Sequence, residues 1–424
     1  MRVQCGPDST RVKSSTFIPS SGRGAWDVFS GTGTDCTEDV ESPSRSDDAG
    51  VGVSTFEDEV EDFFAALPGV LAAAGDELVD RVRALRREMT ARRLVGFGID
   101  ERWGGRTDVP DASRRFQEAA RGRFPKEDGI LGIGLNMAVP IILQYGTDAQ
   151  RDRFVPAALS AREIWCQLYS EPGAGSDLAS LRTTATLDGD EWVVEGQKVW
   201  TSGAHHADLG VLLARTGDAP RHKGISMLVM PMRQPGVEVR PLRQMTGEAE
   251  FNEVFFSGAR VPRDWVIGEV NDGWRAATGL LAHERGSLGR VGADDKREAV
   301  GSAAVPVHYL LDLARRVGHA DDVLVRQDLS RAVTGEKIMD WLGRREVHPS
   351  IGKLWRTRQA RFVASVAARM AMNGAAAHDP VDTDSRFWMY HVLNAPRMSL
   401  GGGTDEIQRN TIGERALGLP REPN

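Results

Sequence analysis

The segment from Trp165 to Ser202, WCQLYSEPGAGSDLASLRTTATLDGDEWVVEGQKVWTS, combines residue types that suit the binding of a planar ligand. The apolar run Trp165–Tyr169 predicts a buried strand, and the Pro and Gly residues after it interrupt regular structure. A glycine-rich loop beside a sheet exposes backbone N–H groups, and Trp200 adds a flat apolar face. Serine hydroxyls add donors at three positions, Ser170, Ser176 and Ser202. These groups suit a flat ligand with many hydrogen-bonding atoms, although a plain array of β-hairpins has the same pattern.

The residues after this loop predict two β-hairpins. Asp188-Gly189 and Glu195-Gly196 are both typical of tight turns between strands. Trp192, Val194 and Trp200 alternate with polar neighbours, which is the pattern of a strand with one buried face.

Glu284, in NDGWRAATGLLAHERGSLGR, is a second candidate for chemistry. The helical spacing of its apolar neighbours places its carboxylate on the apolar stripe of a helix. A carboxylate there must pair with a cation or work in a desolvated site with a raised pKa. Arg285 follows directly, but adjacent residues on a helix do not face each other. The residues alone therefore leave a structural ion pair and a general base as alternatives.

A third candidate segment, Gly401–Arg409, reads GGGTDEIQR. The triple glycine predicts a loop, and Thr404 is a suitable N-cap for a helix with Asp405 and Glu406 in its first turn. From the residues alone, this segment is a glycine hinge before a terminal helix.

These segments together resemble the acyl-CoA dehydrogenase family of flavoproteins. The resemblance rests on SEPGAGSD followed by GQKVWTSGA, and on GTDEIQR near the C-terminus, and it extends from about Phe56 to the end of the chain. An eight-residue match is far more specific than a lone GxGxxG. The resemblance implies FAD as cofactor, an acyl-CoA thioester as substrate and an electron-transfer flavoprotein as electron acceptor. It implies FAD contacts at Gln167, Leu168, Ser170, Ser176, Trp200, Ser202, Thr404 and Glu406.

The family also suggests which residues carry the reaction. Many members have a catalytic Glu where this chain has Gly402, whereas others have Gly there and a Glu-Arg pair on an earlier helix. With Glu284-Arg285, this chain fits the second pattern. The resemblance thus implies that Glu284 takes the α-proton and that a backbone N–H near Gly402 polarises the thioester carbonyl. Ser176 and Arg285 are implied as substrate-binding residues.

Two motifs of many family members are missing. RxxFG has no counterpart after Arg290, and Met372-Asn373-Gly374-Ala375 stands in place of QxxGGxG. A bacterial branch that acts on long-chain or steroid side-chain thioesters is similar in lacking both motifs. Several alternatives stay open: a homo- or hetero-oligomer (dimer or tetramer), a subunit that completes a partner's FAD site, and an oxygen-using acyl-CoA oxidase or monooxygenase.

The fold expected from pattern and resemblance is α+β and mainly α, with an N-terminal helical domain, a central β-barrel and a C-terminal four-helix bundle. Helical spacing of apolar residues begins at Phe56, Val60, Phe63, Phe64 and Leu67. Further helices are predicted over Ala112–Ala120, Leu131–Gln144 and Asp148–Leu159. Strands are predicted over Leu209–Ala214, Ile225–Met230, Val237–Leu242 and Val254–Phe256. The predicted divisions are 1–53 (disordered leader), 54–161 (helical domain), 162–270 (β-barrel domain) and 271–424 (helical bundle).

Composition excludes several classes of protein. A chain of 424 residues with 41% hydrophobic residues can form two or three domains with real cores. A net charge of −7 without a basic block argues against a nucleic-acid binder, and no apolar run approaches the length of a membrane span. The three cysteines lack metal or CxxC spacing, which favours a cytoplasmic protein. His205-His206 with Asp208 lacks a third ligand at useful spacing and is interpreted as a loop, not a metal site.

Overall fold

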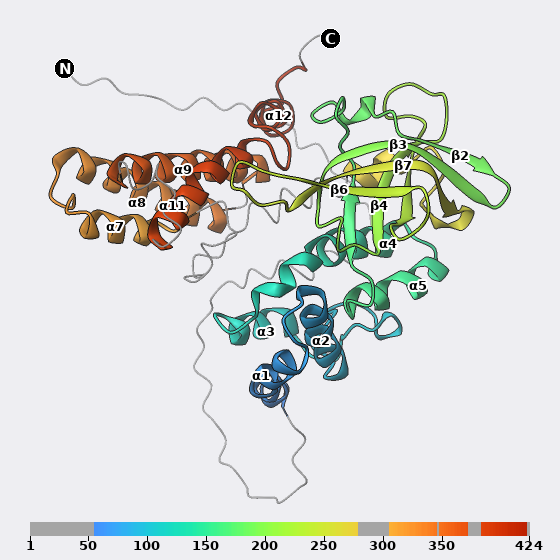
Figure 1. Ribbon diagram of the computed structural model, residues 1–424, viewed down its shortest axis with the longest axis horizontal. Helices are drawn as coiled ribbons and strands as arrows, with labels where there is room; N and C mark the ends of the chain where they lie inside the picture. The colour runs from blue at the N-terminus through green and yellow to red at the C-terminus, as the bar shows by residue number, and fades with distance from the viewer. Residues whose placement is uncertain (1–54, 279–304, 346, 372–382, 422–424) are drawn as a thin grey trace, which may run out of the picture. The chain divides into compact units, whose positions relative to one another are not determined.

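The computed structural model describes residues 55–278, 305–345, 347–371 and 383–421 (Figure 1). The leader 1–53, the candidates Glu284 and Arg285, and the segment that replaces QxxGGxG lie outside these described residues. Within the described chain, helices come first, strands form one sheet in the middle, and helices return at the end. The predicted three-part fold is confirmed, with the central part a single eight-stranded sheet.

The N-terminal helices follow the predicted apolar spacing. Their bounds are α1 Phe56–Ala73, α2 Leu78–Ala91, α3 Ala112–Ala120, α4 Val139–Tyr145 and α5 Asp148–Leu159. The α1 residues expected to face the core, from Phe56 to Leu67, are all buried. The predicted helix Leu131–Gln144 is shorter, because a π-helical turn, Gly134–Ala138, precedes α4. Pro140 lacks the N–H that a regular α-helix needs at this point, which accounts for the wider turn.

Helix α5 is joined to the sheet through its capping residue pair. Thr147 and Gln150 cap this helix, and each side chain bonds the other residue's backbone N–H, at 3.2 and 3.0 Å. The Gln150 amide also donates to the carbonyls of Asp264 and Val266, at 2.6 and 2.8 Å. The start of α5 is therefore fixed against the end of the sheet.

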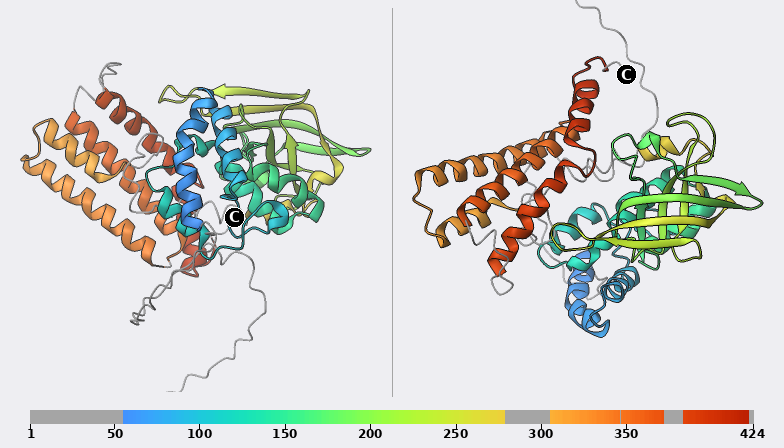
Figure 2. Two further views of the ribbon diagram at one scale, coloured as in Figure 1. Left: turned by 90° about the horizontal axis from the view of Figure 1, so that it is seen from below. Right: turned by 45° about the horizontal axis from the view of Figure 1, so that its top comes forward.

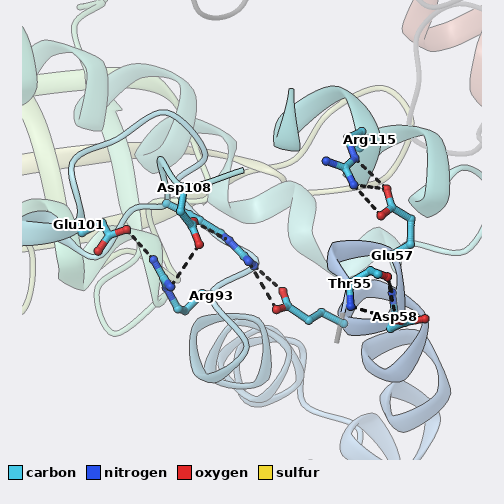
Figure 3. Close-up of polar contacts among 9 residues, drawn as sticks. Thr55, Glu57, Asp58, Arg93, Glu101, Asp108 and Arg115 are labelled. Carbon is cyan, nitrogen blue, oxygen red and sulfur yellow. Dashed lines mark hydrogen bonds and ion pairs between the residues drawn. The ribbon is translucent and has the colours of Figure 1, made fainter. Parts of the chain in front are cut away.

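Arginines of the helical domain pair with its acidic residues, two of them with the first turn of α1 (Figure 3). Arg115 Nε lies 2.7 Å from the Glu57 carboxylate of α1, whereas Arg93 lies 2.6 Å from that of Glu101, outside α1. Arg106 Nη1 lies 2.6 Å from Glu59 and is only 6% exposed. Exposed ion pairs contribute little to stability, so the pair made by the buried Arg106 is the one in this group that matters most.

The strands form one sheet in the order β6-β7-β3-β2-β4-β5-β8, with β1 parallel to β4. The bounds are β1 Trp165–Leu168, β2 Thr184–Asp188, β3 Glu191–Ser202, β4 Leu209–Arg215, β5 Ile225–Pro231, β6 Val237–Leu242, β7 Phe251–Pro262 and β8 Val266–Ile267. Alternate residues of β4 face opposite cores. Leu209, Val211 and Leu213 pack with the helical domain, while Leu212 and Ala214 pack with the sheet's own core. This double burial explains why β4 is apolar from Leu209 to Ala214.

The prediction of a hairpin turn at Glu195-Gly196 is wrong, because β3 runs without a break through these residues. A β-bulge lies here, with a register shift against β7 between Val194 and Glu195. Gly196 has φ +142°, and a Cβ on it would lie 2.7 Å from Thr183 Oγ1. The glycine is needed for a close approach inside the sheet, not for a turn.

The C-terminal part is helical, with α7 Val307–Arg316, α8 Val323–Arg344, α9 Pro349–Ala371, α11 Thr383–Asn394 and α12 Asp405–Thr411. Helices α8 and α9 run side by side in both views of Figure 2. Their shared core with α7 and α11 includes Leu310, Val363 and Trp388. Among the described residues, none of the helices combines the length and the apolar character that a membrane crossing requires.

The close approach of Gly196 to Thr183 gives a prediction about stability. Gly196→Ala should lower the free energy of unfolding by about 1–3 kcal/mol through backbone strain, and further because Thr183 must move. Gly189→Ala is the matched control, since Gly189 has φ +64° but open space around it; its cost should be about 1–2 kcal/mol. Urea denaturation measures both. Equal losses in the two variants would contradict the role assigned to the close approach.

Candidate cofactor-binding site

The loop after β1 makes a tight turn, and the space around its glycines is open. Glu171 and Ala174 exchange backbone hydrogen bonds, both of 3.1 Å, around Pro172-Gly173. Gly173 and Gly175 have no atom within 4 Å of where a Cβ would lie, and Ser176 is exposed. The loop therefore exposes its glycine backbone and the Ser176 hydroxyl to the solvent.

The strand before this loop is largely buried. Leu168 is fully buried, and a Cβ on Gly210 of the neighbouring strand would lie 2.4 Å from its Cδ1. Its side chain is thus committed to the sheet core, and a ligand could be contacted only through its backbone. Gln167 and Ser170 are half-buried.

Trp200 is the most unusual residue of β3. The alternation that places it on the buried face with Trp192 and Val194 fails, because β3 gains an extra residue against β7 between Lys198 and Thr201. Trp200 has φ +61° and is 61% exposed, while Trp192 and Val194 are buried as predicted. An aromatic residue held in a left-handed conformation with its ring exposed is a strong indication of a binding function.

A buried ion pair lies beneath the loop. Lys198 is completely buried, and its Nζ donates to Glu171 Oε1 at 2.7 Å and to the Tyr169 carbonyl at 3.1 Å. The Glu171 carboxylate also accepts the N–H groups of Arg182 and Thr183, at 2.6 and 2.9 Å. This network joins the end of β1, the start of β2 and the middle of β3 at a single point.

The two charges of this pair shift each other's titration. Burial lowers the pKa of Lys198 to about 8, although the Glu171 carboxylate partly opposes this shift. Burial acts to raise the pKa of Glu171, but the Lys198 charge and the hydrogen bonds the carboxylate accepts bring it below its ordinary value. Glu171 therefore stays ionised and supplies the negative charge of the network.

Buried polar side chains also hold the C-terminal glycine loop, through its carbonyl groups. Gly402 and Gly403 have φ +66° and +87°. The buried Lys353 donates to the Gly403 carbonyl at 2.9 Å, and the buried Gln408 amide donates to the Gly402 carbonyl at 2.7 Å. Thr404 caps α12 as predicted, accepting the Ile407 N–H at 3.3 Å.

Two residues connect this loop to Trp200. The Phe251 ring lies edge-on to Trp200, with ring centres 6.0 Å apart, and the Arg397 guanidinium lies 5.4 Å from the centre of the Phe251 ring. The Gly401 N–H donates to the Arg397 carbonyl at 3.0 Å. The structure thus brings Trp200, Ser202 and the glycine loop into one neighbourhood. Glu406 is exposed at the side of α12, where it pairs with Arg409 at 3.3 Å.

Sequence reasoning missed the charged residues that support both loops: Lys198, Glu171, Lys353, Arg397 and Glu250. A signal was available for two of them. Lys198 has the same strand parity as Trp192 and Val194, and so falls on the buried face, where a lysine needs an anion. Glu171 lies inside the loop motif itself. The others have no such local signal.

The buried pair gives a second prediction. Lys198→Met and Glu171→Gln should each lower the free energy of unfolding by about 3–5 kcal/mol, because each leaves a buried group without its partner. The double variant should lose clearly less than the sum of the two single losses. Chemical denaturation measures this, with Arg260→Met, which removes an exposed ion pair to Glu191, as control. Additive losses would contradict a shared network.

The chain matches two family models. Residues 54–162 match the acyl-CoA dehydrogenase N-terminal domain, and residues 166–259 match the acyl-CoA dehydrogenase middle domain.

Among proteins of similar sequence, Acyl-CoA dehydrogenase IpdE1 of Mycobacterium tuberculosis is 39% identical over 379 residues, covering 85% of this chain and 94% of the relative. Acyl-CoA dehydrogenase FadE34 of the same organism is 39% identical over 313 residues, covering 72% of this chain and 42% of the relative.

Two solved structures are also similar. The Tcur3481-Tcur3483 steroid ACAD has a TM-score of 0.68 at 27% identity, over 87% of this chain and 98% of that one. The ChsE4-ChsE5 complex from Mycobacterium tuberculosis has a TM-score of 0.66 at 26% identity, over the same two shares.

Proposed function

Because the chain belongs to the acyl-CoA dehydrogenase family, whose members are flavoprotein oxidoreductases of lipid metabolism, we propose that it catalyses the FAD-dependent α,β-dehydrogenation of an acyl-CoA thioester to the trans-2-enoyl-CoA. The observation that carries this proposal is the exposed, left-handed Trp200, which lies two residues after Lys198, the partner of Glu171 at the start of the open glycine loop. An exposed indole face, on a strand joined to an exposed glycine loop, fits the flat, hydrogen-bonding ring system of a flavin.

The residues proposed to hold FAD come from both loops. Gln167, Leu168 and Ser170 would contribute from the strand end, with Leu168 using its backbone. Ser176, Trp200 and Ser202 would contribute from the loop and β3, and Thr404 and Glu406 from the start of α12. When bound, FAD supplies the acceptor for the hydride that leaves the β-carbon.

The chain's own residues have two tasks in the reaction. Glu284 takes the α-proton as general base, and the backbone near Gly402 donates a hydrogen bond to the thioester carbonyl, which stabilises the charge that develops on its oxygen. Gly402 itself is a poor place for the base, because its φ of +66° strains any residue with a side chain. Ser176 and Arg285 would bind the thioester, and an electron-transfer flavoprotein would accept the electrons.

The substrate can be proposed more specifically. We infer a steroid or other bulky acyl-CoA as substrate, supported by the similarity to a steroid ACAD at 27% identity. A panel of fatty and steroid acyl-CoAs, assayed with an artificial electron acceptor, tests this inference.

For the assembly, we propose that the chain associates with a second, different chain. The similarity to the ChsE4-ChsE5 complex supports this proposal. Purifying the chain alone and measuring flavin absorbance per chain tests it, because a chain that needs a partner should retain little FAD.

The role of Trp200 gives a third prediction. Trp200→Ala should weaken FAD retention or shift the flavin absorbance spectrum, because the ring system loses an aromatic packing face. Trp341→Ala removes an equally exposed tryptophan from α8 and should leave both unchanged. Absorbance spectra and flavin occupancy after dialysis measure the effect. Identical spectra and occupancy in the two variants would contradict the placement of the flavin at Trp200.

The role of Glu284 gives a fourth prediction. Glu284→Gln keeps the size of the side chain but removes the proton acceptor, so bleaching of the flavin by substrate should slow by about 10²–10⁴-fold. FAD should stay bound. Glu269→Gln, which changes an exposed carboxylate, should bleach at the normal rate. Stopped-flow absorbance measures the rate, and full activity in Glu284→Gln would remove this residue as the base.

A further inference from the structure

Arg397 lies in the short 3₁₀ helix Ala395–Ser399, directly before the glycine loop. Its carbonyl oxygen accepts the N–H groups of Leu400 and Gly401, both at 3.0 Å. The backbone of Arg397 is therefore part of the turn from which the glycine loop starts. Any displacement of this residue displaces the first glycine of the loop.

The Arg397 side chain reaches the other half of the site. Its Nη1 lies 2.8 Å from Glu250 Oε2, and its guanidinium lies over the Phe251 ring at 5.4 Å from the centre. Phe251 is the register partner of Ser202 on β3 and touches the edge of Trp200. A single side chain thus contacts two consecutive residues at the end of the strand pair that presents Trp200.

The anion of this pair is anchored to the same strand end. The Glu250 carbonyl accepts the N–H of Gly203, the residue after Ser202, at 3.0 Å. The neighbouring Asn252 amide donates to the Thr201 carbonyl at 3.0 Å and also approaches the Glu250 carbonyl at 3.3 Å. Each partner of the ion pair is therefore tied by its backbone to one of the two segments that the pair connects.

We infer that Arg397 is a positioning residue that sets the glycine loop, with Gly402 and Thr404, in register with Trp200 and Ser202. This inference rests on the proposed function, in which these two segments act on the same flavin and thioester. The arginine does not need to touch either ligand. It holds the carbonyl-polarising backbone at a fixed distance from the flavin-facing strand end.

The side-chain type matters because two contacts are made at once. A planar guanidinium can pair with a carboxylate in its plane while its face lies on an aromatic ring, whereas an ammonium acts as a point charge. The pair is partly exposed, with side chains 31% and 45% accessible, so its contribution to global stability is small. Its effect on the reaction is larger, because a misplacement of about 1 Å in an active site can cost about 100-fold in rate.

The test compares Arg397→Gln, Arg397→Lys and Glu250→Gln with Arg361→Gln. Arg361 is an exposed arginine of α9 that contacts Ser399 at 3.4 Å, so its replacement removes the same charge next to the same segment without touching the Glu250 pair. Arg397→Gln should slow flavin reduction at saturating acyl-CoA by about tenfold or more, with KM and melting temperature close to those of the wild type. Arg397→Lys should recover part of the rate, and Arg397→Gln with Glu250→Gln should be no slower than either alone.

A second measurement does not depend on activity. Amide hydrogen exchange in peptides that contain Gly401–Thr404 and Gly203 should become faster in Arg397→Gln and in Glu250→Gln, but not in Arg361→Gln. Unchanged exchange at both segments overturns the inference, and so does a rate in Arg397→Gln equal to that in Arg361→Gln. A wild-type chain that takes up no FAD, either alone or in assembly with a partner chain, contradicts the proposed function instead. In that case the exchange comparison decides by itself whether Arg397 connects the two segments.

Discussion

The buried ion pair of Lys198 and Glu171 is the constraint on which the candidate site depends. Two charges taken out of water are stable only when each is the other's partner and their remaining hydrogen-bonding capacity is used. Here the carboxylate also accepts two backbone N–H groups and the ammonium also donates to a carbonyl, so the pair fixes three strands at one point. The glycines that follow Glu171, Gly173 and Gly175, are exposed.

A β-bulge after Lys198, not the pair itself, determines how Trp200 is presented. With Lys198 directed into the sheet, a regular strand would direct Trp200 inward as well, since the side-chain period of a strand is two. The extra residue of β3 reverses this parity, so that Val199 and Thr201 are buried and Trp200 is exposed. A strained backbone of this kind costs about 1–3 kcal/mol. It persists because its buried neighbours and the long pairing of β3 with β7 determine the path of the chain on both sides.

Much of the fold could be predicted from the sequence, because helices leave regular signals. The α1 stripe from Phe56, the helix Ala112–Ala120 and the caps at Thr147 and Thr404 follow from spacing and side-chain chemistry alone. The interior of β3 could not be predicted so well. Gly196 looks the same in the sequence whether it serves a turn or a close approach to Thr183, and the structure shows the second. Arg397 and Glu250 are 147 positions apart, so no local pattern connects them. The proposed flavin and substrate roles rest on motif resemblance and stay predictions.

The conformation of the glycine loop bears on where a base can be placed. Gly402 and Gly403 both have positive φ, and their carbonyls are held by Gln408 and Lys353. A loop fixed through its carbonyls has little freedom to relax around a new side chain, and a left-handed position already disfavours one. Its useful contribution is then made by backbone groups of fixed direction, which suits the stabilisation of charge on a thioester oxygen. This strain is the physical reason to propose that the proton acceptor comes from another element, the helix that the sequence predicts around Glu284.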